Sequence, residues 1–172
     1  MKFEIGQINQ RSAKKFIRMH HRHLPKTPAG WKFGGGAFDN DDNLIGVIWI
    51  GRPVARHYDD GSLLEINRLC TIPNIPNLNS QLIAWAVKEC KKNYKKVGGL
   101  VTYLRTYEKA TVMQASNFFF VGVTGKGKWR RNIPQEPKQK WYYPFCKKSR
   151  KKLTEAWRGK IIGVTGMKPK IN

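Results

Sequence analysis

Three histidines near the N-terminus carry side chains that can exchange a proton near neutral pH. His20, His21 and His23 lie at or just past the end of a helix predicted over residues 12–21. If the helix continues, His20 and His23 share one face, where they could act as a base or as metal ligands. No carboxylate has ligand spacing to them, and the alternative is a polar helix C-terminus at which cationic histidine is favoured by the dipole.

Glu65 is the carboxylate best placed for acid–base chemistry. It lies in a strand predicted over Leu63–Ile72, with apolar neighbours on both sides. A carboxylate on a central strand can have a raised pKa and serve as general base toward an amine. A structural ion pair is the alternative, and its possible partners are Arg52, Arg56 and Arg68.

Two further side chains near this carboxylate could take part in the chemistry. Tyr103, at the end of a predicted strand over 100–103, could give a proton to a leaving thiolate, or it could be a core or rim tyrosine. Arg68 could clamp a phosphate, or pair with an acid. Strict strand alternation predicts that Asn67 and Arg68 point to opposite faces, so that at most one of them faces a ligand.

The chain from Leu63 to Val87 indicates an anion site. It reads as a buried strand, a loop rich in Asn and Pro, and an amphipathic helix beginning near Ser80. The start of such a helix offers free backbone N–H groups and the positive end of its dipole to a phosphate. The loop lacks the glycine-rich patterns of dinucleotide sites and P-loops. Ser80 could instead be only an N-cap, and Asn77 and Asn79 only turn formers.

The charge of the chain predicts a polyanionic partner. The 172 residues include 33 Lys and Arg against 11 Asp and Glu, for a net charge of +22. From Lys126 onward there are 15 basic residues and two acids, which accounts for +13 of that charge. Basic side chains bind nucleic-acid phosphates without reading sequence. We expect the contacts to come from Arg130, Arg131, Lys147, Lys148, Arg150, Lys151 and Lys152.

Other compositional features argue against a membrane or secreted protein. No apolar run reaches the roughly 20 residues that span a bilayer, and the first ten residues lack the apolar core of a signal peptide. Three widely spaced cysteines fit reduced thiols better than a disulfide framework or a zinc site. We therefore expect a cytoplasmic protein that faces DNA or RNA and does not bind a membrane.

The predicted elements alternate between strands and helices in the order β-α-β-β-β-α-β-α-β. This order predicts a mixed α/β (α+β) fold with helices packed on a central sheet. A hairpin is expected around the acidic turn at residues 39–43. We expect a core domain over residues 1–125 and a basic, aromatic extension over 126–172 that packs on or beside it.

Several strings carry a resemblance to a known family. They are His20-His21-Arg22-His23, PAGWKFGGGAF, GRPVARHYDDGSLLEINRLCT, NLNSQLIAWAV, LVTY and QASNFFFVG. Together they span roughly residues 13–124. The element order resembles the GNAT fold of N-acetyltransferases, and the strings resemble phage and prophage proteins related to the Mom DNA-modification protein of phage Mu.

The resemblance implies a GNAT-like, mostly antiparallel sheet that binds acetyl-CoA or a related acyl-CoA donor. It implies that the arm of the donor pairs with the central strand at Arg68, Leu69, Cys70 and Thr71. It places the pyrophosphate at Asn77, Asn79, Ser80 and Gln81. It further implies modification of adenine N6 in DNA, which protects phage DNA from restriction, and it raises iron as a possible metal.

Three features depart from the family pattern. The usual GNAT pyrophosphate loop, with Gln or Arg followed by spaced glycines, is absent. Leu104 and Arg105 follow Tyr103 where the relatives tend to carry an acid, and Met113 stands where a tyrosine often precedes the Gln-Ala of the last helix. Tyr107 and Glu108 are the nearest residues that could take the roles of that acid and that tyrosine.

The leading hypothesis is thus a transferase acting on DNA, with His20, His21, Glu65 or Tyr103 handling the proton. One alternative is an ordinary N-acetyltransferase acting on a protein, a tRNA or a small amine. The other is a non-catalytic DNA- or RNA-binding protein on the same scaffold. The sequence leaves the oligomeric state open.

Overall fold

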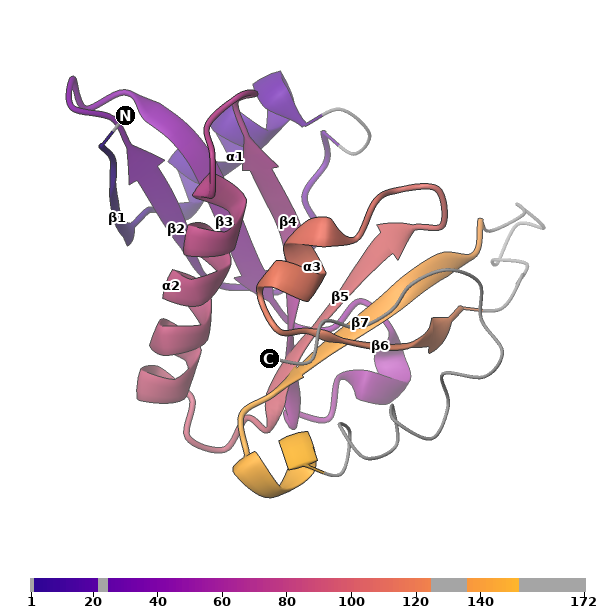
Figure 1. The fold of residues 1–172 in the computed structure, drawn as a ribbon. Helices are drawn as coiled ribbons and strands as arrows, with labels where there is room; N and C mark the ends of the chain where they lie inside the picture. Colours follow the sequence, from indigo (N-terminus) through magenta and orange to yellow (C-terminus); the bar gives the residue numbers. More distant parts are fainter. Residues whose placement is uncertain (1, 22–24, 125–135, 152–172) are drawn as a thin grey trace.

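A seven-stranded sheet with helices on both faces forms the body of the protein (Figure 1). The computed structural model describes residues 2–21, 25–124 and 136–151. The elements are β1 (Glu4–Gln7), α1 (Gln10–His20), β2 (Trp31–Phe38), β3 (Leu44–Gly51), η1 (Arg56–Tyr58), β4 (Leu63–Thr71), α2 (Leu78–Asn93), β5 (Gly99–Arg105), α3 (Thr111–Ala115), β6 (Phe119–Val123) and β7 (Lys138–Pro144).

The strands lie in the order β1-β2-β3-β4-β5-β7-β6. Only β4 and β5 pair in parallel, and every other neighbouring pair is antiparallel. The predicted α/β class with a mixed, mostly antiparallel sheet is confirmed.

The hairpin expected between β2 and β3 is present and has a clear local cause. The Asp39 carboxylate accepts hydrogen bonds from the backbone N–H groups of Asp41 and Asn43, at 3.0 and 2.9 Å. Asp42 adopts a left-handed φ of 61°, which closes the turn. Asx side chains favour such turns because they hydrogen-bond the backbone a few residues on.

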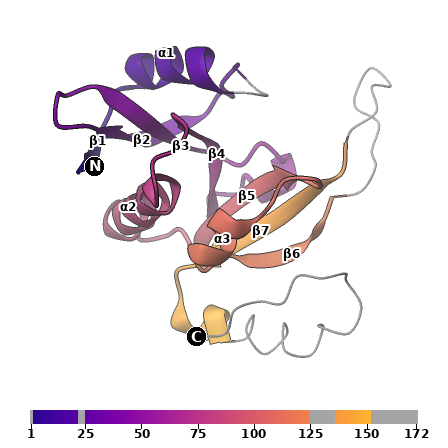
Figure 2. The same cartoon turned by 45° about the horizontal axis from the view of Figure 1, so that its top comes forward.

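The two faces of the sheet carry different helices (Figure 2). On one face, α1 buries Ala13, Phe16 and Ile17, in a cluster with Val47, Trp49 and Cys70. On the other face, α2 packs Leu82, Ile83 and Ala86 in the main core cluster, together with residues of β2 to β5. Met113 of α3 belongs to that second cluster. The helices on the two faces therefore divide the core into two halves, separated by the sheet.

β7 lies in the segment expected to form the C-terminal extension. Residues 138–144 form a strand inserted between β5 and β6. Trp141 and Gln139 of this strand are 1% and 5% exposed. Lys138, the first residue of the strand, is exposed. The sheet therefore does not end at residue 125, and the described part of the extension completes it.

α2 begins two residues earlier than expected. Its first residue is Leu78, which is 1% exposed, and Asn77 precedes it in a left-handed conformation with φ 61°. The apolar side chain of Leu78 extends the buried face of the helix back to the loop. Ser80 is therefore inside the first turn, and the alternative that it is the N-cap is wrong.

Two of the three cysteines lie inside the fold. Cys70 and Cys90 are buried, Cys146 is exposed, and all three are free thiols. In the described ranges, no helix is both long and apolar enough to cross a membrane.

Candidate functional site

The site lies where β4 and β5 part. Three register pairs join the strands, from Leu63–Gly99 to Glu65–Val101. The Thr102 hydroxyl then donates to the Ile66 carbonyl at 3.1 Å. Beyond this point the ends of the two strands diverge (Figure 1). The second half of β4 thus runs along an opening in the sheet.

A bulge in β4 coincides with this point. Trp49 of β3 is opposite Arg68 and Ile50 is opposite Ile66, so Asn67 is the extra residue. A bulge breaks the strict alternation of side chains and re-aims them locally. Asn67 hydrogen-bonds Glu65, and Arg68 interacts with the same carboxylate electrostatically. The expectation that Asn67 and Arg68 point to opposite faces is therefore wrong.

Glu65 is buried on the face that carries α1. Leu64 and Ile66 belong to the core on the α2 side, so alternation turns Glu65 the other way. The residue is 6% exposed, and one carboxylate oxygen accepts the Val54 N–H at 2.8 Å. Burial raises the pKa of Glu65, although the Val54 hydrogen bond and nearby cations oppose the rise. A carboxylate with a raised pKa is suited to accept a proton near neutral pH.

Arg68 lies half-buried beside this carboxylate. Its guanidinium donates to the carbonyl of Asn67 and to that of Lys26, the latter at 2.6 Å. Burial lowers the pKa of Arg68, and the charge of Glu65 opposes this. The contact with Lys26 ties β4 to the segment that follows α1.

Tyr103 lies near Glu65 on the neighbouring strand. Burial, followed by the charges of Glu65 and Tyr58, raises the pKa of Tyr103 to about 12. The ammonium of Lys140, which is opposite Tyr103 in β7, lies 3.6 Å from the centre of the Tyr58 ring. The phenol of Tyr103 therefore stays protonated at neutral pH and can donate a proton.

The rest of the predicted donor strand offers mainly backbone. Leu69 packs against the main core, and Cys70 is buried in the cluster under α1. Burial raises the pKa of the Cys70 thiol to about 11, so it is not a thiolate at neutral pH. The Thr71 hydroxyl donates to the side-chain oxygen of Asn79 at 3.1 Å, which fixes the end of β4 to the start of α2.

The first turn of α2 is open to an anion. Asn77 makes no side-chain capping bond, and the turn contains no acidic residue. The Ser80 hydroxyl donates to the Asn77 carbonyl at 2.9 Å, and Gln81 is exposed. The leading N–H groups of a helix have no partner within it, so they remain available to a phosphate.

His20 and His21 lie at the C-terminal end of α1. His20 is the last residue of α1, is exposed, and its ring lies 4.5 Å from that of Phe16. His21 is the C-cap, where its N–H donates to the Ile17 carbonyl. His23 lies outside the described residues. In the described part of the chain, no group of three or more His, Cys, Asp or Glu residues could hold a metal ion, so iron gains no support.

The predicted nucleic-acid contacts are described only in part. Lys147, Lys148 and Lys151 are exposed in a helical segment after β7. The Arg150 guanidinium lies 5.6 Å from the centre of the Tyr143 ring. Arg130, Arg131 and Lys152 lie outside the described residues.

Sequence reasoning missed three contributors to the site. Val54 supplies a backbone N–H to Glu65, Tyr58 lies beside Tyr103, and Lys140 lies over Tyr58. The signal for Lys140 was present: Gln139 and Trp141 flank it in the alternating pattern of a strand. No sequence pattern predicts that Tyr58 lies in the site, because a short 3₁₀ helix positions it.

The chain shares its fold with solved N-acetyltransferases, so the fold is GNAT-like. Arabidopsis thaliana NAA60, solved in complex with acetyl-CoA, is 15% identical with a TM-score of 0.64, covering 84% of this chain and 100% of that chain. An N-acetyltransferase from Staphylococcus aureus Mu50 is 13% identical, with a TM-score of 0.61 and coverages of 84% and 98%. The ribosomal-protein-S18-alanine N-acetyltransferase from Escherichia coli is 9% identical, with a TM-score of 0.60 and coverages of 83% and 94%.

The family is shown at the level of sequence. The model of the Mom protein family matches residues 2–162, so this chain belongs to the Mom protein family. No curated protein matches the sequence.

Proposed function

We propose that this protein is a group transferase that modifies adenine in DNA with an acyl-CoA-type donor. The observation that carries the proposal is the parting of β4 and β5 beside Glu65 and Tyr103. Membership of the Mom protein family supports a DNA base as the acceptor. Protection of phage DNA from restriction in a cytoplasm is the biological role that fits such an activity.

The described residues fit a donor of this kind. The second half of β4 can pair with an extended arm, because β5 has moved away from it. The first turn of α2 offers N–H groups to a pyrophosphate, and no acid opposes the charge. The hydrogen bond between the Thr71 hydroxyl and the Asn79 side chain holds the end of β4 and the start of α2 in a fixed relation. A bound acyl-CoA would supply an activated acyl group to the opening.

Two side chains provide the proton transfers. Glu65 takes the proton that the attacking exocyclic amine loses as its nitrogen bonds to the acyl carbon. Tyr103 gives its proton to the sulfur as the carbon–sulfur bond breaks. Because an enzyme that acts on a base must take that base out of the duplex, the acceptor reaches these groups as a flipped nucleotide.

Mass spectrometry of nucleosides tests the proposal directly. DNA from cells that express the protein is digested, and we expect an adenosine species of increased mass. The Glu65→Gln variant should lower its amount by about 10² or more, since general base catalysis contributes 10²–10⁴. Glu4→Gln removes an equal charge at an exposed site in β1 and should change nothing. Unmodified adenosine in DNA from cells with the wild-type protein would overturn the proposal.

An ordinary N-acetyltransferase is the second candidate. The named activities of the structural neighbours favour it. Incubation with labelled acetyl-CoA and peptide, tRNA or small-amine acceptors in the absence of DNA separates the two functions. The DNA-modifying function predicts label only when DNA is present, whereas the ordinary function predicts label without it.

A further inference from the structure

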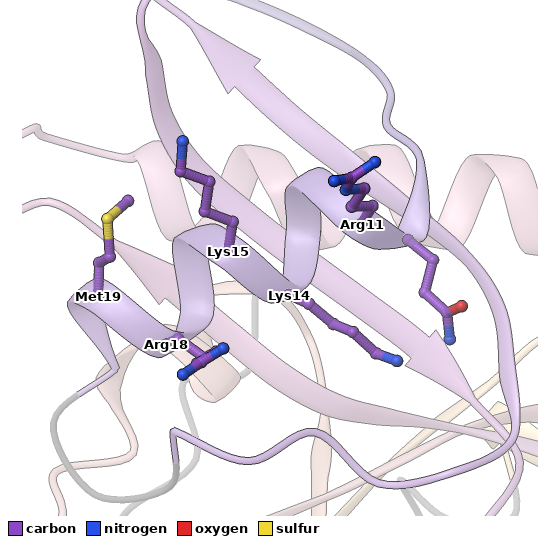
Figure 3. Close-up of a pocket in the computed structure, with 6 residues that line it drawn as sticks. Arg11, Lys14, Lys15, Arg18 and Met19 are labelled. Atoms are coloured by element: carbon purple, nitrogen blue, oxygen red, sulfur yellow. The ribbon is translucent and has the colours of Figure 1, made fainter.

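The outer side of α1 carries an uncompensated strip of positive charge. Arg11, Lys14, Lys15 and Arg18 are all exposed, and we call these four residues the α1 strip. Gln10 and Met19 complete a shallow hollow of about 720 Å³ along the helix (Figure 3). The helix contains no acidic residue.

The strip does not help the helix to form. Arg11 with Lys15 and Lys14 with Arg18 are like-charged pairs at i,i+4, each of which destabilises a helix by about 0.2–0.5 kcal/mol. Arg11 also lies in the first turn, where the dipole disfavours a cation. Within residues 2–21, 25–124 and 136–151, no ion pair joins the strip to a carboxylate. A partner outside the chain would remove this repulsion.

The arrangement of α1 favours a nucleic acid over a membrane. Helices that lie on membranes insert an apolar face between the lipids. The apolar face of α1 is already occupied, because Ala13, Phe16 and Ile17 are 0–3% exposed against the sheet. Only Met19 adds exposed apolar surface, at 62%. The strip therefore presents charge without the apolar area that a lipid surface needs.

The dimensions of the strip match a duplex backbone. Arg11 and Arg18 are seven residues apart, or about 10 Å along the helix axis at 1.5 Å per residue. Each strand of double-stranded DNA carries one charge per about 3.4 Å of its axis. Four cations over this length can therefore each meet a phosphate of one strand.

The strip also belongs to the helix that covers the Glu65 side of the sheet. α1 packs on the face of the sheet to which Glu65 points, and the segment after α1 accepts a hydrogen bond from Arg68 through Lys26. A strand of DNA held along α1 would thus be carried toward the opening between β4 and β5. Phosphate contacts of this kind fix position and carry no sequence information.

We propose that the α1 strip binds the sugar–phosphate backbone of duplex DNA and positions it at the opening between β4 and β5. The α1 strip lies on the surface of the N-terminal part of the fold and is separate from the basic residues after β7. The inference rests on the proposed DNA-modifying function for its choice of polyanion. Binding of the duplex needs no donor and no chemistry, so it can be measured independently of that function.

Fluorescence anisotropy with a labelled 20-base-pair duplex tests the strip across a range of salt concentrations. The test variant replaces all four residues: Arg11→Gln, Lys14→Gln, Lys15→Gln and Arg18→Gln. Each lost phosphate contact lowers the slope of log K against log salt by about 0.9, so the slope should fall by about 3–4. We expect Kd at 0.15 M salt to rise at least about tenfold. Glutamine keeps the helix propensity, and circular dichroism checks the fold.

A matched control removes the same charge from another surface. Lys88, Lys92, Lys95 and Lys96 are exposed on or just after the C-terminal half of α2. Their fourfold replacement by glutamine should leave the slope within about one unit of the wild-type value. Equal losses in the two variants, or an unchanged slope in the α1 variant, would overturn the proposal. So would stronger dependence on the strip for anionic vesicles than for the duplex. If the α1 strip proves necessary for duplex binding while adenosine stays unmodified, the proposed DNA-modifying function is wrong and the proposal that the strip binds duplex DNA is confirmed.

Discussion

Glu65 of β4 and Tyr103 of β5 lie close enough on neighbouring strands that the charge of Glu65 raises the pKa of Tyr103. Burial, and then the negative charge of Glu65, raises the pKa of Tyr103 to about 12. Glu65 itself accepts the Val54 N–H, which favours its charged form against the effect of burial. Tyr103 therefore holds its proton at neutral pH, and Glu65 offers carboxylate oxygens that can accept one, so an acid and a base are placed in one site.

The raised pKa of Glu65 predicts a pH-dependent cost to stability. Its folded-state pKa lies above the ordinary value of 4.5, so the folded protein binds this proton more tightly than the unfolded chain. The protonated Glu65 carboxyl contributes stability that is fully present below pH 4.5 and is lost as pH rises through the folded-state pKa. Glu65→Gln removes this loss, so the variant should gain in free energy of unfolding relative to wild type as pH rises from 4 to 8.

Denaturant unfolding at several pH values measures that difference. Glu4→Gln, at an exposed position, should run parallel to wild type across the whole range. A stability difference between Glu65→Gln and wild type that does not grow with pH would show that Glu65 has no raised pKa.

Removal of the Tyr103 hydroxyl should slow the reaction without weakening binding. Tyr103→Phe keeps the ring and loses the proton that the site gives to the leaving group. We expect kcat to fall by about 10² with little change in KM, the usual scale of general acid catalysis. Tyr107→Phe is the control, because Tyr107 is 64% exposed and its hydroxyl accepts from Arg105. Equal kinetics for Tyr103→Phe and wild type would exclude the role of proton donor.

The sequence predicted the elements of the fold better than it predicted the environment of the site. The β2–β3 hairpin and α2 follow from local signals, namely the acidic turn and the helical spacing of apolar residues. The sequence favours a tail over a strand at residues 138–144, because three of them are polar or basic and three are aromatic residues next to basic ones. The hydrogen bonds of β7 come from β5 and β6, which are far away in sequence, and only the alternation of Gln139 and Trp141 indicates a strand.

The bulge at Asn67 shows why the site itself was harder to predict. Its position depends on the register between β3 and β4, which no local pattern encodes. Once it is present, Asn67 and Arg68 both interact with Glu65, and the simple alternation rule fails at the residue where the chemistry is expected.

The bond between Thr71 and Asn79 should matter for both stability and donor binding. Thr71→Val replaces the hydroxyl with a methyl group and leaves the Asn79 oxygen without its donor at 3.1 Å. Loss of such a hydrogen bond costs about 1 kcal/mol, measured by denaturant unfolding. Because the bond fixes the start of α2 to β4, we also expect a higher KM for the acyl-CoA donor. Thr71→Ser keeps the hydroxyl and should restore both values, and a Thr71→Ser variant as impaired as Thr71→Val would contradict this role.

Close packing against Gly51 predicts that the bulge tolerates no side chain there. A Cβ at Gly51 would overlap the side-chain oxygen of Asn67 and would lie 2.9 Å from the Gly30 carbonyl, which is backbone and cannot rotate away. Gly51→Ala should therefore destabilise the protein by about 1–3 kcal/mol, as overpacking does, and should lower activity by moving Asn67 away from Glu65. Gly6→Ala is the matched control, because a Cβ there meets nothing within 4 Å. Thermal unfolding of both variants decides the point: equal melting temperatures would mean that the backbone around Asn67 yields, and that the bulge is not held by this contact.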